Sequence, residues 1–264
     1  MTHRLWILLI LGLFFLPMGC APKFWTAPPE LEKDPAEVWQ ELKAREKQKL
    51  GDHQGYLARS SLHYQSSRNS SRLVFSLWGN YALPLRLDLK AGIGTSLSHW
   101  RLGQDMTLAY YPRQDKVFVY KDAEQALRHL QLELPFTVPE IGQILTGRWA
   151  DLVPSDYTRA RTVQGKGWEF DFPDSSRLQS ILVDPEFRII QARGHSPLNW
   201  ELELKDFQDT QGTDTYARSL ELDMGQEGRA LFRIRELELR EQAWPDSRLK
   251  LEPPQDVQYV PLAL

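Results

Sequence analysis

The sequence predicts a mainly β protein: an unclosed antiparallel β-barrel of about 11 strands, covered by helices. Three observations lead to this prediction. Segments with a two-residue apolar period follow one another along most of the chain, short turn sequences separate them, and two helical segments interrupt them near the middle. A long antiparallel sheet tends to curl, and helices in the middle of the order cannot join it. We therefore expect the helices to form a lid over its concave face.

A helix is expected to open the folded part of the chain. Asp34 suits the N-cap and Pro35 the first helical position, because proline has no N–H to leave unpaired there. Apolar residues then recur at helical spacing among Glu and Lys as far as Gly51. From Gln54 onward the period changes to two, which is typical of half-buried strands.

The clearest strands alternate leucine with charge, as in Leu85–Lys90 and in the segment that starts at Trp200. Phe232 and Ile234 are out of phase with the leucines that follow them, which predicts a β-bulge. The interrupting helices are expected at 122–131 and 139–147. The strand candidates begin at residue 54 and continue at 73–78, 85–90, 96–102, 106–111, 116–120, 161–163, 167–172, 180–183, 188–194, 199–206, 218–224 and 230–240.

The N-terminus carries an apolar run, residues 5–16, that is shorter than the roughly 20 residues of a spanning helix and ends shortly before Cys20. This stretch resembles a bacterial lipoprotein signal. The resemblance implies a signal peptide over 1–19, lipidation of Cys20 and a tether over 20–33. Ala21 follows the cysteine, and in such lipoproteins a residue other than Asp there fits the outer membrane. The alternatives are an uncleaved anchor and ordinary cleavage that leaves a free thiol.

Composition excludes several classes of function. A net charge of −3 without a sustained Lys/Arg stripe argues against a nucleic-acid binder, and a single Cys cannot form an internal disulfide. The glycines in 92–97 and 142–149 lack the context of a nucleotide-binding loop, and the histidines have no metal-ligand spacing. We expect no metal, no cofactor and no catalytic residue, hence no enzyme.

The order of features resembles the LolB family of outer-membrane lipoprotein receptors, in the superfamily shared with the periplasmic carrier LolA. The resemblance is densest in "RLDLKAGIGTSLSHWRLGQDMTLAYYPRQDKVFVYKDAEQALRHL" and in "LPFTVPEIGQILTGRW". It implies a half-barrel with a helical lid over 34–244 and leaves 245–264 as a C-terminal extension. The extension could be an added strand or a partner segment.

The resemblance also implies a function. Proteins of that family bind the acyl chains of lipoproteins in an apolar cavity, receive them from a LolA-like carrier and insert them into the outer membrane. Gly92, Ile93 and Gly94 match the family's loop that places cargo in the membrane; the alternative for Ile93 is a lone aliphatic residue at a hairpin tip. We expect a monomer.

The inward positions of the predicted strands are candidates for the acyl-chain cavity, with ordinary core as the alternative for each of them. The cavity candidates are Phe75, Leu87, Leu89, Trp100, Met106, Leu108, Trp200 and Leu202. A structural or assembly-factor lipoprotein of the same fold, its cavity filled by side chains, is the alternative function. A lipid-modifying hydrolase is a third class and would need a polar triad inside the cavity.

Overall fold

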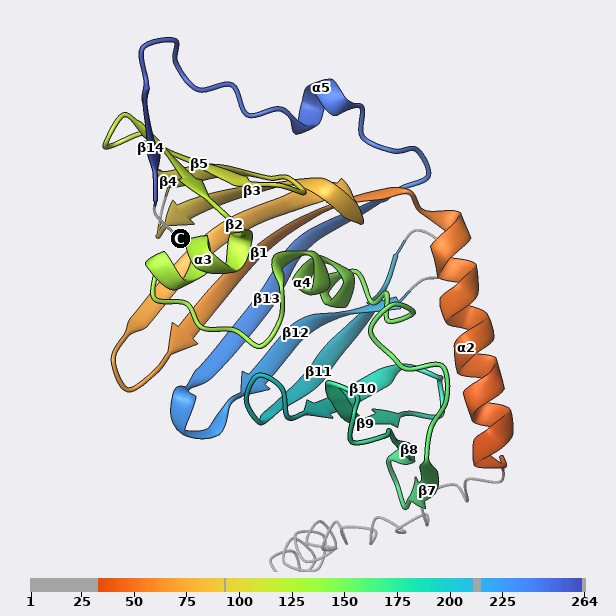
Figure 1. Ribbon diagram of the computed structural model, residues 1–264. Coiled ribbons are helices and arrows are strands. Elements are labelled where there is room, and N and C mark those ends of the chain that lie inside the picture. The colour runs from red at the N-terminus through yellow and green to blue at the C-terminus, as the bar shows by residue number, and fades with distance from the viewer. Residues whose placement is uncertain (1–32, 93, 211–214, 263–264) are drawn as a thin grey trace, which may run out of the picture. The chain divides into compact units, whose positions relative to one another are not determined.

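Fourteen strands form one continuous sheet in the computed structural model, which describes residues 33–92, 94–210 and 215–262 (Figure 1). The strands are β1 (Gly55–Gln65), β2 (Ser70–Asn80), β3 (Ala82–Ala91), β4 (Thr95–Leu102), β5 (Thr107–Tyr111), β6 (Lys116–Tyr120), β7 (Arg159–Val163), β8 (Gly167–Asp171), β9 (Leu178–Val183), β10 (Ile189–Gly194), β11 (Trp200–Asp209), β12 (Thr215–Asp223), β13 (Arg229–Arg240) and β14 (Gln258–Pro261).

The sheet is an antiparallel meander in two halves. Strands β1 to β6 and β7 to β13 each pair in chain order, and β1 joins the halves by pairing with β13. The order ends in β14 on one side and β7 on the other, so the barrel is unclosed, as predicted. The strand number exceeds the expected 11 partly because β14 comes from the C-terminal extension.

The helices are α2 (Pro35–Asp52), α3 (Ala123–His129), α4 (Val138–Leu145) and α5 (Asp246–Leu249). The first three match the predicted helices. Asp34 caps α2 by accepting a hydrogen bond of 2.7 Å from the backbone of Ala36. No helix in the described part of the chain has the length and apolar character needed to cross a bilayer.

The sheet buries its concave face. Leucine, phenylalanine and tryptophan side chains continue from strand to strand, for example from Trp100 on β4 to Leu87 on β3 and Leu77 on β2. The predicted bulge is present, because Ser60 opposes Ile234 while Arg59 opposes Glu236. It lets both parts of the long strand β13 follow β1.

The segment from Ala123 to Trp149, which we call the lid, lies over this concave face and contains α3 and α4 (Figure 1). A capping box at Thr137 and Glu140 starts α4. Helix α4 approaches the sheet so closely that a Cβ atom at Gly142 would lie 2.0 Å from the hydroxyl of Tyr56 on β1. Glycine is therefore required where the lid crosses β1.

The C-terminal extension supplies an added strand. Trp244 precedes it and is held at Asn80, whose side-chain oxygen and nitrogen bond the Trp244 backbone at 2.6 and 3.0 Å. Helix α5 contacts β3, and β14 pairs in parallel with β6 at the edge of the sheet. In Figure 1 the extension passes along the side of the sheet opposite the lid.

Candidate functional site: a covered apolar face and a pocket at its end

Most of the predicted cavity residues share one face of the sheet. The side chains that point to the lid side and are buried are Phe75, Leu87, Leu89, Trp100, Trp200 and Leu202. Each is at most 5 % exposed, and their strands come from both halves of the sheet. The alternation of leucine with charge predicted these positions because the strands are half-buried.

Met106 and Leu108 do not belong to this face, and their assignment to the cavity was wrong. Met106 precedes β5 and is 45 % exposed. Leu108 opposes Arg101, whereas Ala109 opposes the inward-facing Trp100. The apolar run around β5 concealed which residues face inward, because both sides of this short strand carry apolar side chains.

The lid covers the apolar face. Ile141, Ile144 and Leu145 of α4 are buried, and Phe136, ahead of α4, packs edge-on against Trp200 with ring centroids 4.7 Å apart. Trp100, under the lid, is fully buried. In this structure the concave face is therefore filled by side chains of the lid rather than open.

Helix α2 holds one end of the lid. The buried carboxylate of Glu46 accepts a hydrogen bond of 2.5 Å from the backbone N–H of Trp149, and Lys49 donates to the carbonyl of Gly147 at 2.9 Å. Lys49 also pairs with Glu46 at 2.8 Å. A small polar cluster thus fastens the C-terminal end of the lid to the last turns of α2.

Arg177 holds the other side of the lid. Its guanidinium pairs with Glu140 of α4 at 2.7 Å and also donates to the carbonyl of Pro135. Because Arg177 precedes β9, this contact joins the lid to the second half of the sheet. Polar contacts therefore hold the lid at its margins, and apolar packing holds it in the middle.

A pocket of about 350 Å³ lies between α2, the end of the lid and the strands β10 to β12. Leu204 of the covered face and Trp149 of the lid line it, and Phe187 and Phe207 add aromatic walls. This volume is at the lower end of the range for small-molecule sites. At this pocket a concavity reaches the covered face from outside.

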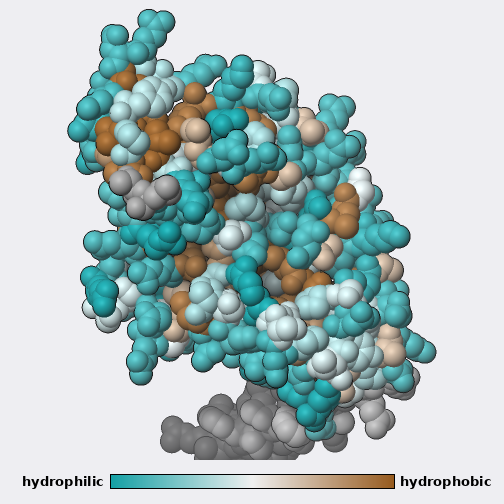
Figure 2. All heavy atoms as spheres, viewed as in Figure 1, coloured by the Kyte–Doolittle hydropathy of each residue, from teal (hydrophilic) through white to brown (hydrophobic). Residues whose placement is uncertain are grey.

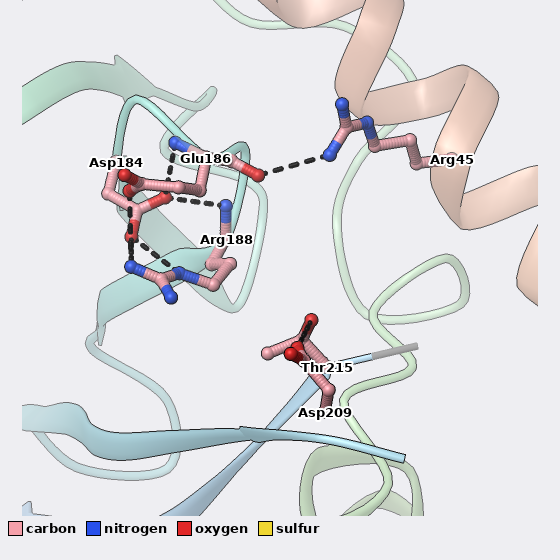
Figure 3. Close-up of polar contacts among 6 residues, drawn as sticks. All are labelled: Arg45, Asp184, Glu186, Arg188, Asp209 and Thr215. Carbon is pink, nitrogen blue, oxygen red and sulfur yellow. Dashed lines mark hydrogen bonds and ion pairs between the residues drawn. The ribbon is translucent and has the colours of Figure 1, made fainter. Parts of the chain in front are cut away.

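A turn held by Asp184 shapes one wall of this pocket (Figure 3). The Asp184 carboxylate accepts the backbone N–H groups of Glu186 and Arg188 at 3.1 and 2.8 Å and the side chain of Arg188 at 2.7 Å. Arg45 of α2 donates to the carbonyl of Glu186 at 3.1 Å. These bonds place Phe187, which has a positive φ of 63°, beside the guanidinium of Arg45.

The space-filling view shows apolar side chains gathered in separate groups among polar ones on the face that it presents (Figure 2). At the turn between β3 and β4, Gly92 and Gly94 have positive φ angles of 47° and 88°, with open space where a side chain would lie. Ile93 and Cys20 lie outside the described residues, so their predicted roles remain predictions.

A polar triad does occur, but on the other side of the sheet. Ser96 bonds the Nε2 atom of His99 at 2.9 Å, and the Nδ1 atom of His99 lies 2.9 Å from Asp88. The side chains of Asp88 and His99 alternate with the inward-facing Leu87 and Trp100, so they point away from the covered apolar face. A lipid-modifying hydrolase would need a polar triad inside the cavity, and this triad lies outside it. No group of three metal-ligating side chains occurs among the residues that the structure describes.

The fold is similar to several solved structures. A DUF1329 family protein from Desulfovibrio piger superposes with a TM-score of 0.57 at 11 % identity, over 83 % of this chain and 98 % of that one. A LolA superfamily protein from Nitrosomonas europaea gives 0.51 at 10 % identity, over 80 % and 97 %. A domain named for outer-membrane lipoprotein sorting, from Vibrio parahaemolyticus, gives 0.50 at 13 % identity, over 81 % and 94 %.

These comparisons define the class of fold. No family model matches the sequence, and no curated protein sequence matches it. The open antiparallel sheet with a helical lid is similar to the fold of these structures, one of which is a LolA superfamily protein, and this confirms the predicted fold class. At these identities the likeness concerns the fold alone.

Proposed function

We propose that this protein is an envelope lipoprotein that binds the acyl chains of other lipoproteins between the sheet and the lid. It receives them from a periplasmic LolA-like carrier and inserts them into the outer membrane. In this proposal Cys20 carries the lipid anchor. The observation that carries the proposal is the apolar face that both halves of the sheet share beneath two short helices.

The energetics of the lid support binding by displacement. Helices α3 and α4 have 7 and 8 residues, lengths at which an isolated helix is marginal in water. Their position therefore depends on apolar contacts with the sheet. An acyl chain offers equivalent contacts, with about 0.8 kcal/mol for each methylene buried, so it can replace the lid on the apolar face.

Release requires a competing apolar phase, and the proposed anchor keeps the protein next to one. An acyl chain held on the sheet moves spontaneously into the bilayer when the bilayer binds it more strongly. In the proposal, Ile93 enters the membrane between Gly92 and Gly94 and lowers the barrier to transfer. The open space around both glycines, in the turn between β3 and β4, supports this role for the loop.

Transfer of a labelled lipoprotein from its carrier to liposomes tests the proposal. Wild type is expected to accelerate transfer. Ile93→Glu should transfer at least about tenfold more slowly than wild type, because a charge resists entry into the bilayer. Ile93→Leu should retain the wild-type rate. Equal transfer by wild type and Ile93→Glu would remove Ile93 from the mechanism. Absence of transfer by wild type would remove the function.

A second candidate is a structural or assembly-factor lipoprotein with this fold. The filling of the apolar face by the lid favours it, because a packed interior needs no ligand. A fluorescent fatty acid separates the two candidates. Saturable binding at a site that brings the probe near Trp100 or Trp200 supports transport, whereas no binding supports the structural role.

A further inference from the structure

Five hydroxyl and indole donors lie buried on the apolar face without a hydrogen bond in the described part of the chain. Two of them, the hydroxyls of Tyr111 and Tyr120, are neighbours. The other three are the hydroxyl of Tyr56, the hydroxyl of Ser60 and the indole N–H of Trp200. All three residues are at most 5 % exposed, and all three belong to strands that the lid covers. Buried polar groups in proteins are nearly always paired, so three on one face require an explanation.

The Tyr56 hydroxyl lies directly beneath the lid. Gly142 of α4 lies against it, since a side chain there would clash with the hydroxyl. Burial raises the pKa of Tyr56 well above its usual value, so this group remains a donor throughout the physiological pH range. Displacement of α4 would present the hydroxyl to whatever takes the place of the helix.

Ser60 lies on the same side of β1 as Tyr56, between Phe75 on β2 and Ile234 on β13. Trp200 lies in the other half of the sheet, beneath Phe136 of the lid. Trp100 provides a contrast, because its indole N–H donates to Ser98 at 2.7 Å within the same apolar face. An inward-facing tryptophan can therefore be satisfied internally in this fold, and Trp200 is not.

We infer that these donors bind the carbonyl oxygens of ester- and amide-linked acyl chains once the lid is displaced. The inference rests on the proposed function and specifies the chemistry of its ligand. A plain hydrocarbon would leave Tyr56 and Ser60 as unpaired as the lid does. A chain joined through an ester or an amide brings acceptors into the same apolar space and pairs them.

This arrangement makes the site selective for acylated molecules. An apolar trough alone distinguishes ligands weakly, by the number of methylenes that it buries. Buried donors that are paired only by the correct ligand discriminate more strongly, because the wrong ligand leaves them without a partner. The face would then prefer diacylglyceryl and N-acyl groups over free alkyl chains.

The test compares two lipids that differ only in their linkage: a dipalmitoyl glycerol ester and the dihexadecyl glycerol ether, which lacks carbonyl groups. Wild type is expected to bind the ester at least about tenfold more tightly, as one or two net hydrogen bonds would provide. The double variant Tyr56→Phe/Ser60→Ala is expected to bring the two affinities within about twofold by weakening ester binding alone. Its stability should be unchanged or higher, since it removes unpaired buried hydroxyls.

Tyr64→Phe is the matched control, because Tyr64 occupies the same face of the same strand; it should leave the preference for the ester intact. Equal binding of ester and ether by wild type would overturn the inference and leave the proposed function standing. If the double variant still preferred the ester, the inference would also be overturned and the proposed function would stand. Absence of binding of either lipid would overturn both.

Discussion

The carboxylate of Glu46 and the backbone N–H of Trp149 form a buried hydrogen bond of 2.5 Å, although 103 residues separate them in the chain. The bond joins the first helix of the fold to the end of the lid. Lys49 pairs with the same carboxylate and also binds the Gly147 carbonyl, so four polar groups close this end of the apolar face together.

Glu46→Ala is expected to lower the free energy of unfolding by about 2 kcal/mol, because it leaves the Trp149 N–H and the Lys49 ammonium without their acceptor. Urea denaturation measures this loss. Hydrogen exchange at residues 147–149 should also accelerate, since the lid loses its attachment to α2. Glu41→Ala is the control: Glu41 forms an exposed pair with Arg45 on the same helix, worth less than about 0.5 kcal/mol. Equal stability of both variants would contradict a role for Glu46 in closing the lid.

Gly142→Ala tests how closely α4 approaches the sheet. The added methyl group would lie 2.0 Å from the Tyr56 hydroxyl, so the helix must move outward. We expect a loss of about 1–3 kcal/mol by overpacking, despite the better helix propensity of alanine. Thermal denaturation provides the measurement.

Gly51→Ala is the matched control for Gly142→Ala, because Gly51 lies in α2 with open space around it. There the substitution should stabilise the protein by up to about 1 kcal/mol. If the lid is displaced when ligand binds, Gly142→Ala should also accelerate uptake of a fluorescent fatty acid while Gly51→Ala does not. A Gly142→Ala variant as stable as wild type would show that α4 does not rest on Tyr56.

The tyrosines under the lid predict a loss of stability at high pH. Burial raises the pKa of Tyr56 and of Tyr111 in the folded protein well above the usual value, while an unfolded tyrosine titrates near pH ~10. Above that pH the unfolded chain releases protons that the folded protein retains. Stability should therefore be constant with respect to these groups below pH ~10 and fall above it, by up to about 1.4 kcal/mol per pH unit for each group.

Urea denaturation between pH 8 and about 11.5 measures this slope. Tyr56→Phe should reduce the slope of the unfolding free energy against pH by the contribution of one titrating tyrosine. Tyr259→Phe, at an exposed tyrosine, should leave it unchanged. The same slope in wild type and Tyr56→Phe would mean that the hydroxyl is not buried in solution as it is in the structure.

The part of the fold that could be predicted was the part in which apolar residues recur at a regular period along the sequence. The segment from Trp200 alternates apolar and charged residues because one face of β11 is buried and the other is solvated, so its orientation followed from the sequence. Around β5 both faces are apolar, and Met106 and Leu108 were assigned to the wrong side. Periodicity carries no information where both faces of a strand carry apolar side chains.

Contacts between segments that are distant in the chain could not be predicted from the sequence. Nothing near Glu46 or Trp149 indicates that they meet, because the register of α2 against the lid is decided by the whole sheet. Ser60 and Tyr56 likewise looked like ordinary strand residues, and their lack of partners becomes visible only when every neighbour is placed. A polar residue at an inward position of a clear strand is the one signal that could have identified them.

The C-terminal extension predicts a change in self-association. Its last strand, β14, pairs with Lys116–Val119 of β6 and covers what would otherwise be the free edge of the sheet. Exposed strand edges pair with other chains. Deletion of 258–264 should therefore produce concentration-dependent dimers or larger species in sedimentation velocity, where we expect the full-length protein to remain monomeric.

Two comparisons locate the cause of that association at the β6 edge. Deletion of 245–264 also removes α5 but exposes the same edge, so it should associate to a similar extent. Tyr259→Ala removes the most exposed large apolar side chain of β14 and keeps its backbone, so it should remain monomeric. Because the proposed anchoring brings many copies onto one membrane surface, a free edge there would meet others at high local concentration. A monomeric 258–264 deletion would refute the assignment of β14 as edge protection.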